Sequence, residues 1–292
     1  MEPNTIGIEH NPQPHDIFHK IETMRQLCER AESPYLLEQT QRVAWLDLCV
    51  MFERVSTEHP EFPMMMSAAL ELTAEWPSRV CVAPTRWLDK LARGGAEPRC
   101  QLAKSVDVRG LKLDGRGLMR VLTSQYMSRC AVLRLDDQDL GLDVVRALAD
   151  SPYLRALREL YCSRTGLGDD GLELLVESAN LRCVEILSAC NANISDDGIF
   201  AIAQSVELVA LRELYLGENT IGDRGAIALT QVRRMWGLER LGLGNNPEIG
   251  HEGAGYLVRR APQRFPKMRS IDLWGCDVTD DLCWEVSVTN YA

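Results

Sequence analysis

From residue 103 onward, hydrophobic residues recur with a fixed spacing along the chain. Within each unit, two leucine-like positions alternate with polar residues, which is typical of a short strand with one buried face. The first of these positions is occupied by Val106, Leu133, Leu160, Leu187, Leu214, Leu241 and Ile271. The steps are 27 residues five times in succession and then 30 residues. A period of this length indicates a solenoid, in which each unit covers the apolar face of its neighbour.

Each strand segment is followed by a turn and a helix pattern. Asn219 and Asn246 occupy one turn position, where an amide can bond backbone groups that the turn leaves free. Acidic residues then precede an apolar run of helical spacing, as in GLGDDGLELLVESA (166–179), and we expect them to cap helix N–H groups. The pairs at this position are Asp169/Asp170, Asp196/Asp197 and Asp280/Asp281. Because the pairs recur with the repeat, we interpret them as capping residues and not as catalytic dyads.

The stretch LRELYLGENTIGDRGAIAL (211–229) resembles a leucine-rich repeat, closest to the ribonuclease-inhibitor-like class. Two units, LSACNANISDDGIFAIA (187–203) and LWGCDVTDDLCWEV (273–286), are similar to the cysteine-containing repeats that often accompany F-boxes. The resemblance implies an α/β fold over residues 101–292. It would be a right-handed solenoid of about seven strand–helix repeats with a parallel sheet on its concave face. A resemblance of this kind implies an architecture and not a chemistry.

The first hundred residues do not follow the 27-residue step. Apolar residues recur at helical spacing in 15–31, 34–55, 63–76 and 85–92, and prolines punctuate these runs. We therefore predict an all-helical region over residues 14–100, preceded by a disordered tail of residues 1–13. This region either caps the first repeat or docks a second protein.

The segment SRVCVAPTRWLDKLA (78–92) allows a further comparison. Val80, Cys81 and Trp87 are similar in kind to the end of an F-box, which precedes the repeats in substrate receptors of ubiquitin ligases. The Leu-Pro opening of an F-box is missing upstream, and the gap between Cys81 and Trp87 is long. The alternative is that both side chains pack into the cap.

Composition narrows the possible partners and compartment. The chain has 292 residues and a formal net charge of −10, which disfavours a nucleic acid or an anionic membrane as partner. No apolar run approaches the roughly 20 residues of a membrane span, and the polar start lacks the features of a secretory signal. The ten cysteines show no CxxC spacing. We expect reduced thiols in a cytoplasmic protein.

Catalytic chemistry is not indicated. Among five histidines, only His15 and His19 share a helical face, and convincing further metal ligands are lacking. The chain contains no GxSxG, no HExxH and no phosphate-binding loop. We predict no catalytic residue, no cofactor and no metal, and hence a protein that is not an enzyme.

The strand residues between the buried positions are expected to project from the concave face. Tyr161 and Tyr215 lie two repeats apart in one row, and aromatic and arginine side chains among acidic ones are typical of protein-binding hot spots. The predicted partner-binding residues are Arg134, Asp136, Asp137, Glu159, Tyr161, Arg164, Glu213, Tyr215, Glu218, Arg240, Asp272 and Trp274.

The sequence thus predicts a non-catalytic protein–protein interaction scaffold, or a structural subunit of a larger complex. A partner protein would bind its concave face. Two alternatives remain open. One is the substrate receptor of a ubiquitin ligase with a degenerate F-box, and the other is an enzyme inhibitor or sensor of the ribonuclease-inhibitor type.

Overall fold

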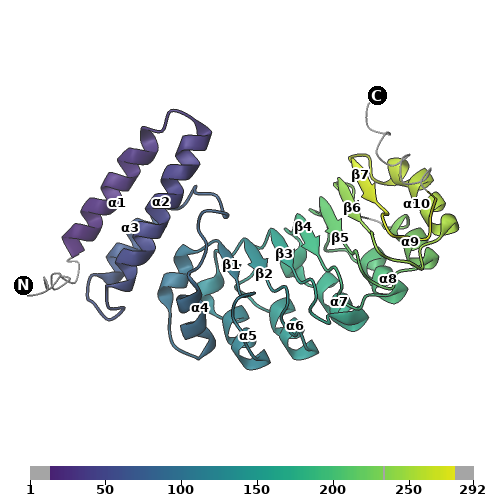
Figure 1. Ribbon diagram of the computed structural model, residues 1–292. Helices are drawn as coiled ribbons and strands as arrows, with labels where there is room; N and C mark the ends of the chain where they lie inside the picture. Colours follow the sequence, from purple (N-terminus) through teal and green to yellow (C-terminus); the bar gives the residue numbers. More distant parts are fainter. Residues whose placement is uncertain (1–13, 233, 280–292) are drawn as a thin grey trace, which may run out of the picture.

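The computed structural model describes residues 14–232 and 234–279, and begins with three helices packed together (Figure 1). These are α1 (Pro14–Glu29), α2 (Pro34–Glu53) and α3 (Phe62–Leu72). The start of α2 has a sequence cause: the Ser33 hydroxyl accepts the N–H of Leu36 at 3.3 Å, and Pro34 follows as the first helical residue. The predicted tail of residues 1–13 lies outside the described residues, as does the Asp280/Asp281 pair.

Seven parallel strands follow and form one sheet in chain order. They are β1 (Ser105–Asp107), β2 (Val132–Arg134), β3 (Glu159–Tyr161), β4 (Ile186–Ser188), β5 (Glu213–Tyr215), β6 (Arg240–Gly242) and β7 (Ser270–Asp272). The register pairs each of the predicted repeat positions with its equivalent in the next strand, including Leu241 with Ile271 across the 30-residue step. The prediction of an α/β solenoid with a parallel sheet is therefore confirmed.

A row of helices covers the convex side of the sheet (Figure 1). They are α4 (Thr85–Ala92), α5 (Gly115–Leu122), α6 (Leu142–Ala149), α7 (Gly168–Val176), α8 (Asp196–Gln204), α9 (Asp223–Leu229) and α10 (His251–Arg264). Short 3-10 turns occur at η1 (Pro98–Leu102), η2 (Gln125–Met127) and η3 (Ala179–Leu181). None of the helices in the described residues combines the length and the apolar composition that crossing a lipid bilayer requires.

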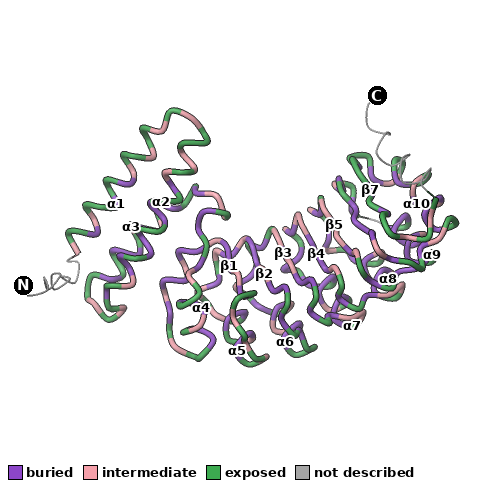
Figure 2. Tube along the Cα trace, viewed as in Figure 1, coloured by how far each residue is buried: buried purple, intermediate pink, exposed green. Residues whose placement is uncertain are grey.

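The core lies between the sheet and these helices (Figure 2). Leu160, Leu187 and Leu214 form one continuous row with no exposed surface at all. One strand and one short helix cannot bury such a row alone, so each coil depends on the next for its apolar contacts.

The sheet-like hydrogen bonding begins before β1. Val82 forms a parallel bridge with Ser105, and the carbonyl of Cys81 accepts the N–H groups of Lys104 and Ser105 at 2.8 and 3.0 Å. The same pair of bonds recurs between successive strands further along the array. The solenoid therefore includes an earlier coil, with α4 as its helix, upstream of the residue 101 at which the sequence placed the domain limit. The equivalent residues Cys81 and Lys104 are only 23 positions apart, which hides this coil from the 27-residue step.

Buried asparagines connect neighbouring turns, as the sequence predicted. The side-chain oxygen of Asn219 accepts the N–H groups of Ala192 and Ile194 at 2.9 and 3.1 Å. Its amide nitrogen donates to the carbonyls of Ala189 and Leu216, both at 2.9 Å. One side chain thus satisfies four backbone groups that water does not reach.

Aspartates cap helices, but the capped helix belongs to the next repeat. The Asp169 carboxylate, at the start of α7, accepts the N–H groups of Ser195 and Gly198 at the start of α8. Asp196 and Asp223 do the same for α9 and α10. A Cβ at Gly198 would lie 2.5 Å from the Asp169 carboxylate, so the close approach requires glycine. The sequence predicted the capping role and not this connection between repeats.

Candidate functional site on the concave strand face

The concave face carries two tyrosines on either side of β4. The register places Tyr161 of β3, Ser188 of β4 and Tyr215 of β5 in one row. Because neighbouring strands lie roughly 4.8 Å apart, the backbones of the two tyrosines are separated by about 10 Å. The small side chain of Ser188 between them is itself buried, at 9% exposure.

Tyr161 is held from two sides. Its hydroxyl donates to the Glu159 carboxylate at 2.9 Å, and the Arg134 guanidinium lies 4.0 Å from the ring centroid. Burial and the bond to Glu159 raise the pKa of Tyr161 to about 12. The bond to Glu159 and the contact with Arg134 fix the ring before any partner arrives.

Tyr215 repeats this arrangement on the other side of β4. Its hydroxyl donates to the Glu213 carboxylate at 2.7 Å, and Arg240 forms an ion pair with the same carboxylate. Burial and the bond to Glu213 raise the pKa of Tyr215 as well. A Cβ at Gly242 would lie 2.8 Å from the tyrosine ring, so the ring leans over β6 where glycine leaves room. The arginine partner thus comes from β2 for the first tyrosine and from β6 for the second.

The floor between the tyrosines is made of small polar side chains. The Ser163 and Ser188 hydroxyl oxygens lie 3.1 Å apart, and half-buried Cys190 lies just beyond them. The half-buried Ile186 of β4 lies beside this floor, in the row of Glu159 and Glu213. We call Arg134, Tyr161, Ser188, Tyr215 and Arg240 the tyrosine surface.

Three further predicted residues lie along a rim beside this surface. The Arg164 guanidinium bonds the Asp137 carboxylate at 2.6 and 3.0 Å and lowers its pKa. The Glu218 carboxylate accepts a bond from the Asn191 amide at 3.2 Å. These three residues and Asn191 all have a left-handed backbone, with φ between 50° and 64°. The turn, and not a partner, dictates this conformation.

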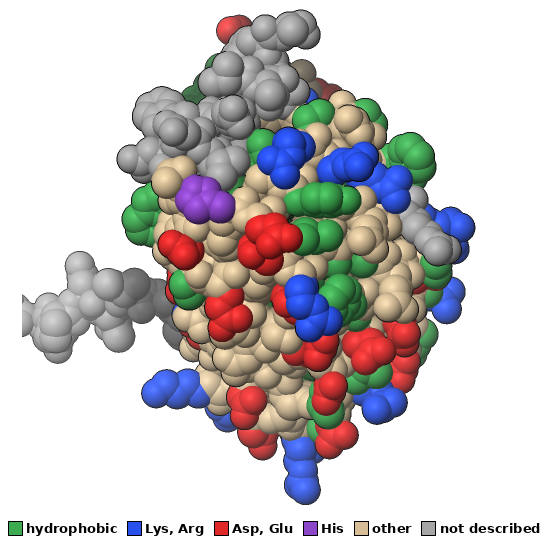
Figure 3. All heavy atoms as spheres, turned by 90° about the vertical axis from the view of Figure 1, so that its right-hand side faces the viewer, with side chains coloured by type: hydrophobic (Ala, Val, Ile, Leu, Met, Phe, Trp, Pro, Cys, Tyr) green, Lys and Arg blue, Asp and Glu red, His purple; other side chains and the backbone are tan. Residues whose placement is uncertain are grey.

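Other predicted residues lie elsewhere. Asp136 is buried, and its carboxylate accepts the Ser163 N–H at 2.9 Å, so its role is within the sheet. Asp272 and Trp274 lie at β7, two strands beyond Tyr215, where Trp274 is 71% exposed. Seen from this end of the array, acidic, basic and hydrophobic side chains are interspersed over the surface (Figure 3). The structure therefore does not bring this pair onto the tyrosine surface.

A ladder of alternating charges runs along the starts of the strands. Successive oppositely charged side chains lie 3.3, 3.8, 2.6 and 3.1 Å apart. The ladder consists of Arg158, Glu185, Arg212, Glu239 and Arg269. This ladder was not predicted, although the sign of the charge alternates at one repeat position of the sequence.

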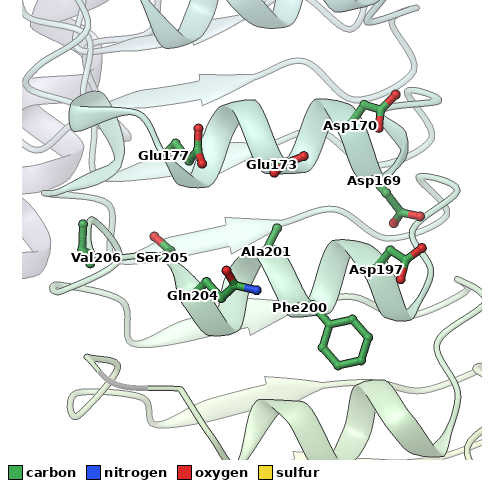
Figure 4. Close-up of a pocket in the computed structure, with 10 residues that line it drawn as sticks. All are labelled: Asp169, Asp170, Glu173, Glu177, Asp197, Phe200, Ala201, Gln204, Ser205 and Val206. Atoms are coloured by element: carbon green, nitrogen blue, oxygen red, sulfur yellow. The ribbon is translucent and has the colours of Figure 1, made fainter.

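The convex side has an acidic hollow between α7 and α8, with a volume of about 560 Å³ (Figure 4). Its acidic lining consists of Asp169, Asp170, Glu173, Glu177 and Asp197. Asp169 is already engaged as the cap of α8. Among residues 14–232 and 234–279, no group of three or more His, Cys, Asp and Glu side chains is placed to hold a metal ion. We therefore assign no ligand to this hollow.

The comparison with protein families agrees with this geometry. A family model described as Leucine Rich repeat matches residues 210–229, which span β5 and α9. Residues 210–229 are a leucine-rich repeat, and the seven-stranded array has the leucine-rich-repeat fold. No curated protein matches the sequence significantly.

Several solved structures are similar to this leucine-rich-repeat protein. The C-terminal domain of tropomodulin from Caenorhabditis elegans has a TM-score of 0.37 and 15% identity, over 50% of this chain and 86% of that one. A TLR13–ssRNA13 complex has a TM-score of 0.36 and 16% identity, over 61% and 30%. The yeast Rad7–Elc1 complex has a TM-score of 0.30 and 13% identity, over 95% and 96%. At such low TM-scores, these structures indicate nothing about the partner of this chain.

Proposed function

We propose that this leucine-rich-repeat protein is a non-catalytic interaction scaffold that binds a partner protein on the tyrosine surface. The observation that carries the proposal is the paired Tyr161 and Tyr215, each fixed by a carboxylate and accompanied by an arginine, over a floor of small residues. Tyrosine and arginine dominate binding energy at protein interfaces. Because these side chains are already ordered, binding requires little further loss of side-chain entropy.

The spacing of the tyrosines suggests the shape of the bound segment. Because the floor at Ser188 is buried, an extended chain or loop of the partner would lie over both rings, whose backbones are about 10 Å apart. Each tyrosine hydroxyl donates its proton to a glutamate and keeps acceptor capacity. We therefore expect the partner to contribute hydrogen-bond donors between the two rings.

The two alternative functions receive no support from specific contacts. Val80, Cys81 and Trp87, which are similar in kind to the end of an F-box, are all buried. The coil formed around Val82 and α4 accounts for their burial. We accordingly propose neither a ligase receptor nor an inhibitor of the ribonuclease-inhibitor type.

Affinity enrichment with quantitative mass spectrometry tests the proposal. The bait is the full chain, compared with the variant Tyr161→Ala/Tyr215→Ala. Losing two hot-spot tyrosines should reduce recovery of a specific partner at least tenfold. Tyr161→Phe/Tyr215→Phe keeps the rings and should retain more of it.

Tyr35→Ala is the matched control, because Tyr35 is 72% exposed on α2 and lies outside the tyrosine surface. Circular dichroism and thermal melts verify that each bait is folded. Equal recovery of every partner by the wild type and the double alanine variant would rule out the tyrosine surface as the binding site.

A further inference from the structure

Helix α2 is apolar on two opposite sides. Its inner side, which includes Trp45, Leu48 and Phe52, is buried. Its outer side carries a second line of residues that we call the α2 stripe: Leu36, Gln39, Val43, Leu46 and Val50. The four apolar members are 49, 63, 65 and 44% exposed, in chain order. Single exposed apolar residues are ordinary on a surface, but a continuous line of them indicates a contact.

The spacing of the stripe specifies the shape of what it contacts. Its members follow one another at intervals of three, four, three and four residues, which is the a/d seam of a coiled coil. Leu36, Val43 and Val50 take the a positions, and Leu46 takes a d position. β-Branched residues at a, here Val43 and Val50, with leucine at d, here Leu46, favour a pair of helices. The stripe therefore fits one other helix.

The charges beside the stripe favour a second copy of the same helix in parallel orientation. Arg42 and Asp47 occupy the g and e positions, five residues apart. Arg42 bonds Glu38 of its own helix at 3.3 and 3.0 Å. In a parallel pair its guanidinium would also face Asp47 of the partner subunit, and the contact would occur twice by symmetry. Asp47 has no ion pair within the described part of the chain, so its carboxylate is available.

Gln39 supports the same orientation. In a parallel pair it lies opposite Gln39 of the partner subunit, where the two amides bond each other. In an antiparallel pair it faces an aliphatic side chain instead, and its amide is buried without a partner. A polar residue at one core position is a common way to fix the register of paired helices.

The part of the chain that the structure describes leaves the stripe exposed. The solenoid contacts α2 through Trp45, whose indole N–H donates to the carbonyl of Val82 at 3.0 Å, and through Glu38, which bonds Arg79 at 2.9 Å. It also contacts Glu53, which forms an ion pair with Arg86 of α4. At roughly 100° per residue, Trp45 and Glu38 lie about a quarter turn around the helix from the stripe, and Glu53 lies beyond its last residue, Val50. A second α2 can therefore approach without displacing the array.

We propose that two copies of this protein associate through the α2 stripe as a parallel pair of helices. The interface is small, below the about 800 Å² per partner of a stable complex, so the dimer is weak and in the micromolar range. It presents two tyrosine surfaces in one assembly, which strengthens binding to any partner with two copies of the recognised segment. The dimer itself does not depend on the proposed function.

Sedimentation of the full chain tests this inference. Between roughly 1 and 100 µM chain, the average mass should rise from the monomer toward the dimer. Leu46→Glu places a carboxylate in the seam and should keep the chain monomeric over this range. The matched control is Leu142→Glu, because Leu142 is another exposed leucine, on α6, and lies outside the stripe. It should dimerise like the wild type. A wild-type chain that stays monomeric at the highest concentration would overturn the inference.

Charge exchange tests the orientation and does not depend on Leu46→Glu folding. Arg42→Asp and Asp47→Arg each place like charges opposite one another and should weaken the dimer several-fold. The double variant restores opposite charges and should recover wild-type association. A Gln39→Cys variant should also form a disulfide-linked dimer under mild oxidation, in higher yield than the wild-type chain with its own cysteines. Failure of both the recovery and the cross-link would exclude the parallel pair.

Discussion

The two halves of the repeat array bury their leucines alike but differ in the polar bonds between coils. Over residues 166–279, aspartates cap the helix of the following repeat and asparagines join adjacent turns. Over residues 103–165, Asp114 caps its own helix α5 through the Gly117 N–H at 2.8 Å, and α6 starts at Gly141 without a side-chain cap. The apolar pattern is uniform, whereas the bonds between coils that capping aspartates and turn asparagines make occur in the C-terminal half. In the N-terminal half, other side chains join the coils, as where Asp136 bonds the Ser163 N–H and Ser151 the Leu122 carbonyl.

This difference indicates where the array resists opening. The stability of a solenoid is approximately a sum of the intrinsic stability of each repeat and the interface with its neighbours. Polar bonds between coils strengthen the interface terms of the C-terminal half. The N-terminal half depends more on its apolar contacts and on the coil of Val82 and α4 that covers its first strand.

The largest difference between the halves is expected at the turn position. Asn219→Ala leaves four buried backbone groups without their partners and should lower the free energy of unfolding by about 3 kcal/mol. Gln138 occupies the equivalent position in the N-terminal half and makes one bond, to the Val108 carbonyl at 3.3 Å. Gln138→Ala should therefore lower it by only about 1 kcal/mol. Denaturant unfolding of both variants measures this, and equal losses would contradict the comparison.

An intermediate effect is expected at the aspartates. Asp196→Ala removes the two bonds to Gly222 and Gly225 and should lower the free energy of unfolding by about 2 kcal/mol. Hydrogen exchange should rise in α9, which loses the cap, more than in α8, which contains the substitution. Asp197→Ala is the control, since the adjacent exposed carboxylate is not part of this cap. A rise confined to α8 would show that the capping bond does not join the repeats.

The smallest effect is expected in the charge ladder. Glu239 pairs with Arg212 at 2.6 Å and Arg269 at 3.1 Å, and these bonds, Arg212 foremost, lower its pKa below the usual 4.5. Because the pKa of Glu239 is lower in the folded state, its ion pairs stabilise the fold at pH values above the pKa of the unfolded state. This stabilisation is lost as the pH falls through the pKa of the folded state.

Glu239→Gln should therefore slightly lower the melting temperature at pH 7. The difference should disappear in acid and shrink in about 1 M salt. Thermal melts across pH and salt measure it, with Glu177→Gln on the convex side as the control. A difference that persists unchanged in acid would mean that the charge of Glu239 is not its cause.

The sequence predicts the repeat well because burial enforces it. A leucine displaced from the 27-residue step would turn away from the core, and so the strand register could be predicted directly. The coil at Cys81 could not be predicted in this way, because the 23-residue step from Cys81 to Lys104 breaks the 27-residue period. The side chains of the tyrosine surface were predicted from the alternation of buried and exposed residues along a strand. This rule no longer holds for residues that follow the end of the strand. Asp136 follows β2 and turns inward to bond Ser163.

The sequence also could not predict which apolar side of α2 is buried. Apolar residues occur on both sides of that helix, and the sequence does not indicate which side meets α1 and α3. Similarly, an aspartate before a helix indicates capping, but only the packing of neighbouring coils decides which N–H groups it reaches. These features depend on contacts between segments, and such contacts are absent from any single repeat.

The alternating charges also restrict how the length of this array can change. From Arg158 to Arg212, the sign pattern repeats only every 54 residues, and the letters RELY recur with that same interval. Deleting a single coil would set Arg158 directly beside Arg212, whereas deleting two neighbouring coils would preserve the sequence of signs. The natural unit for shortening or extending this protein is thus a pair of coils.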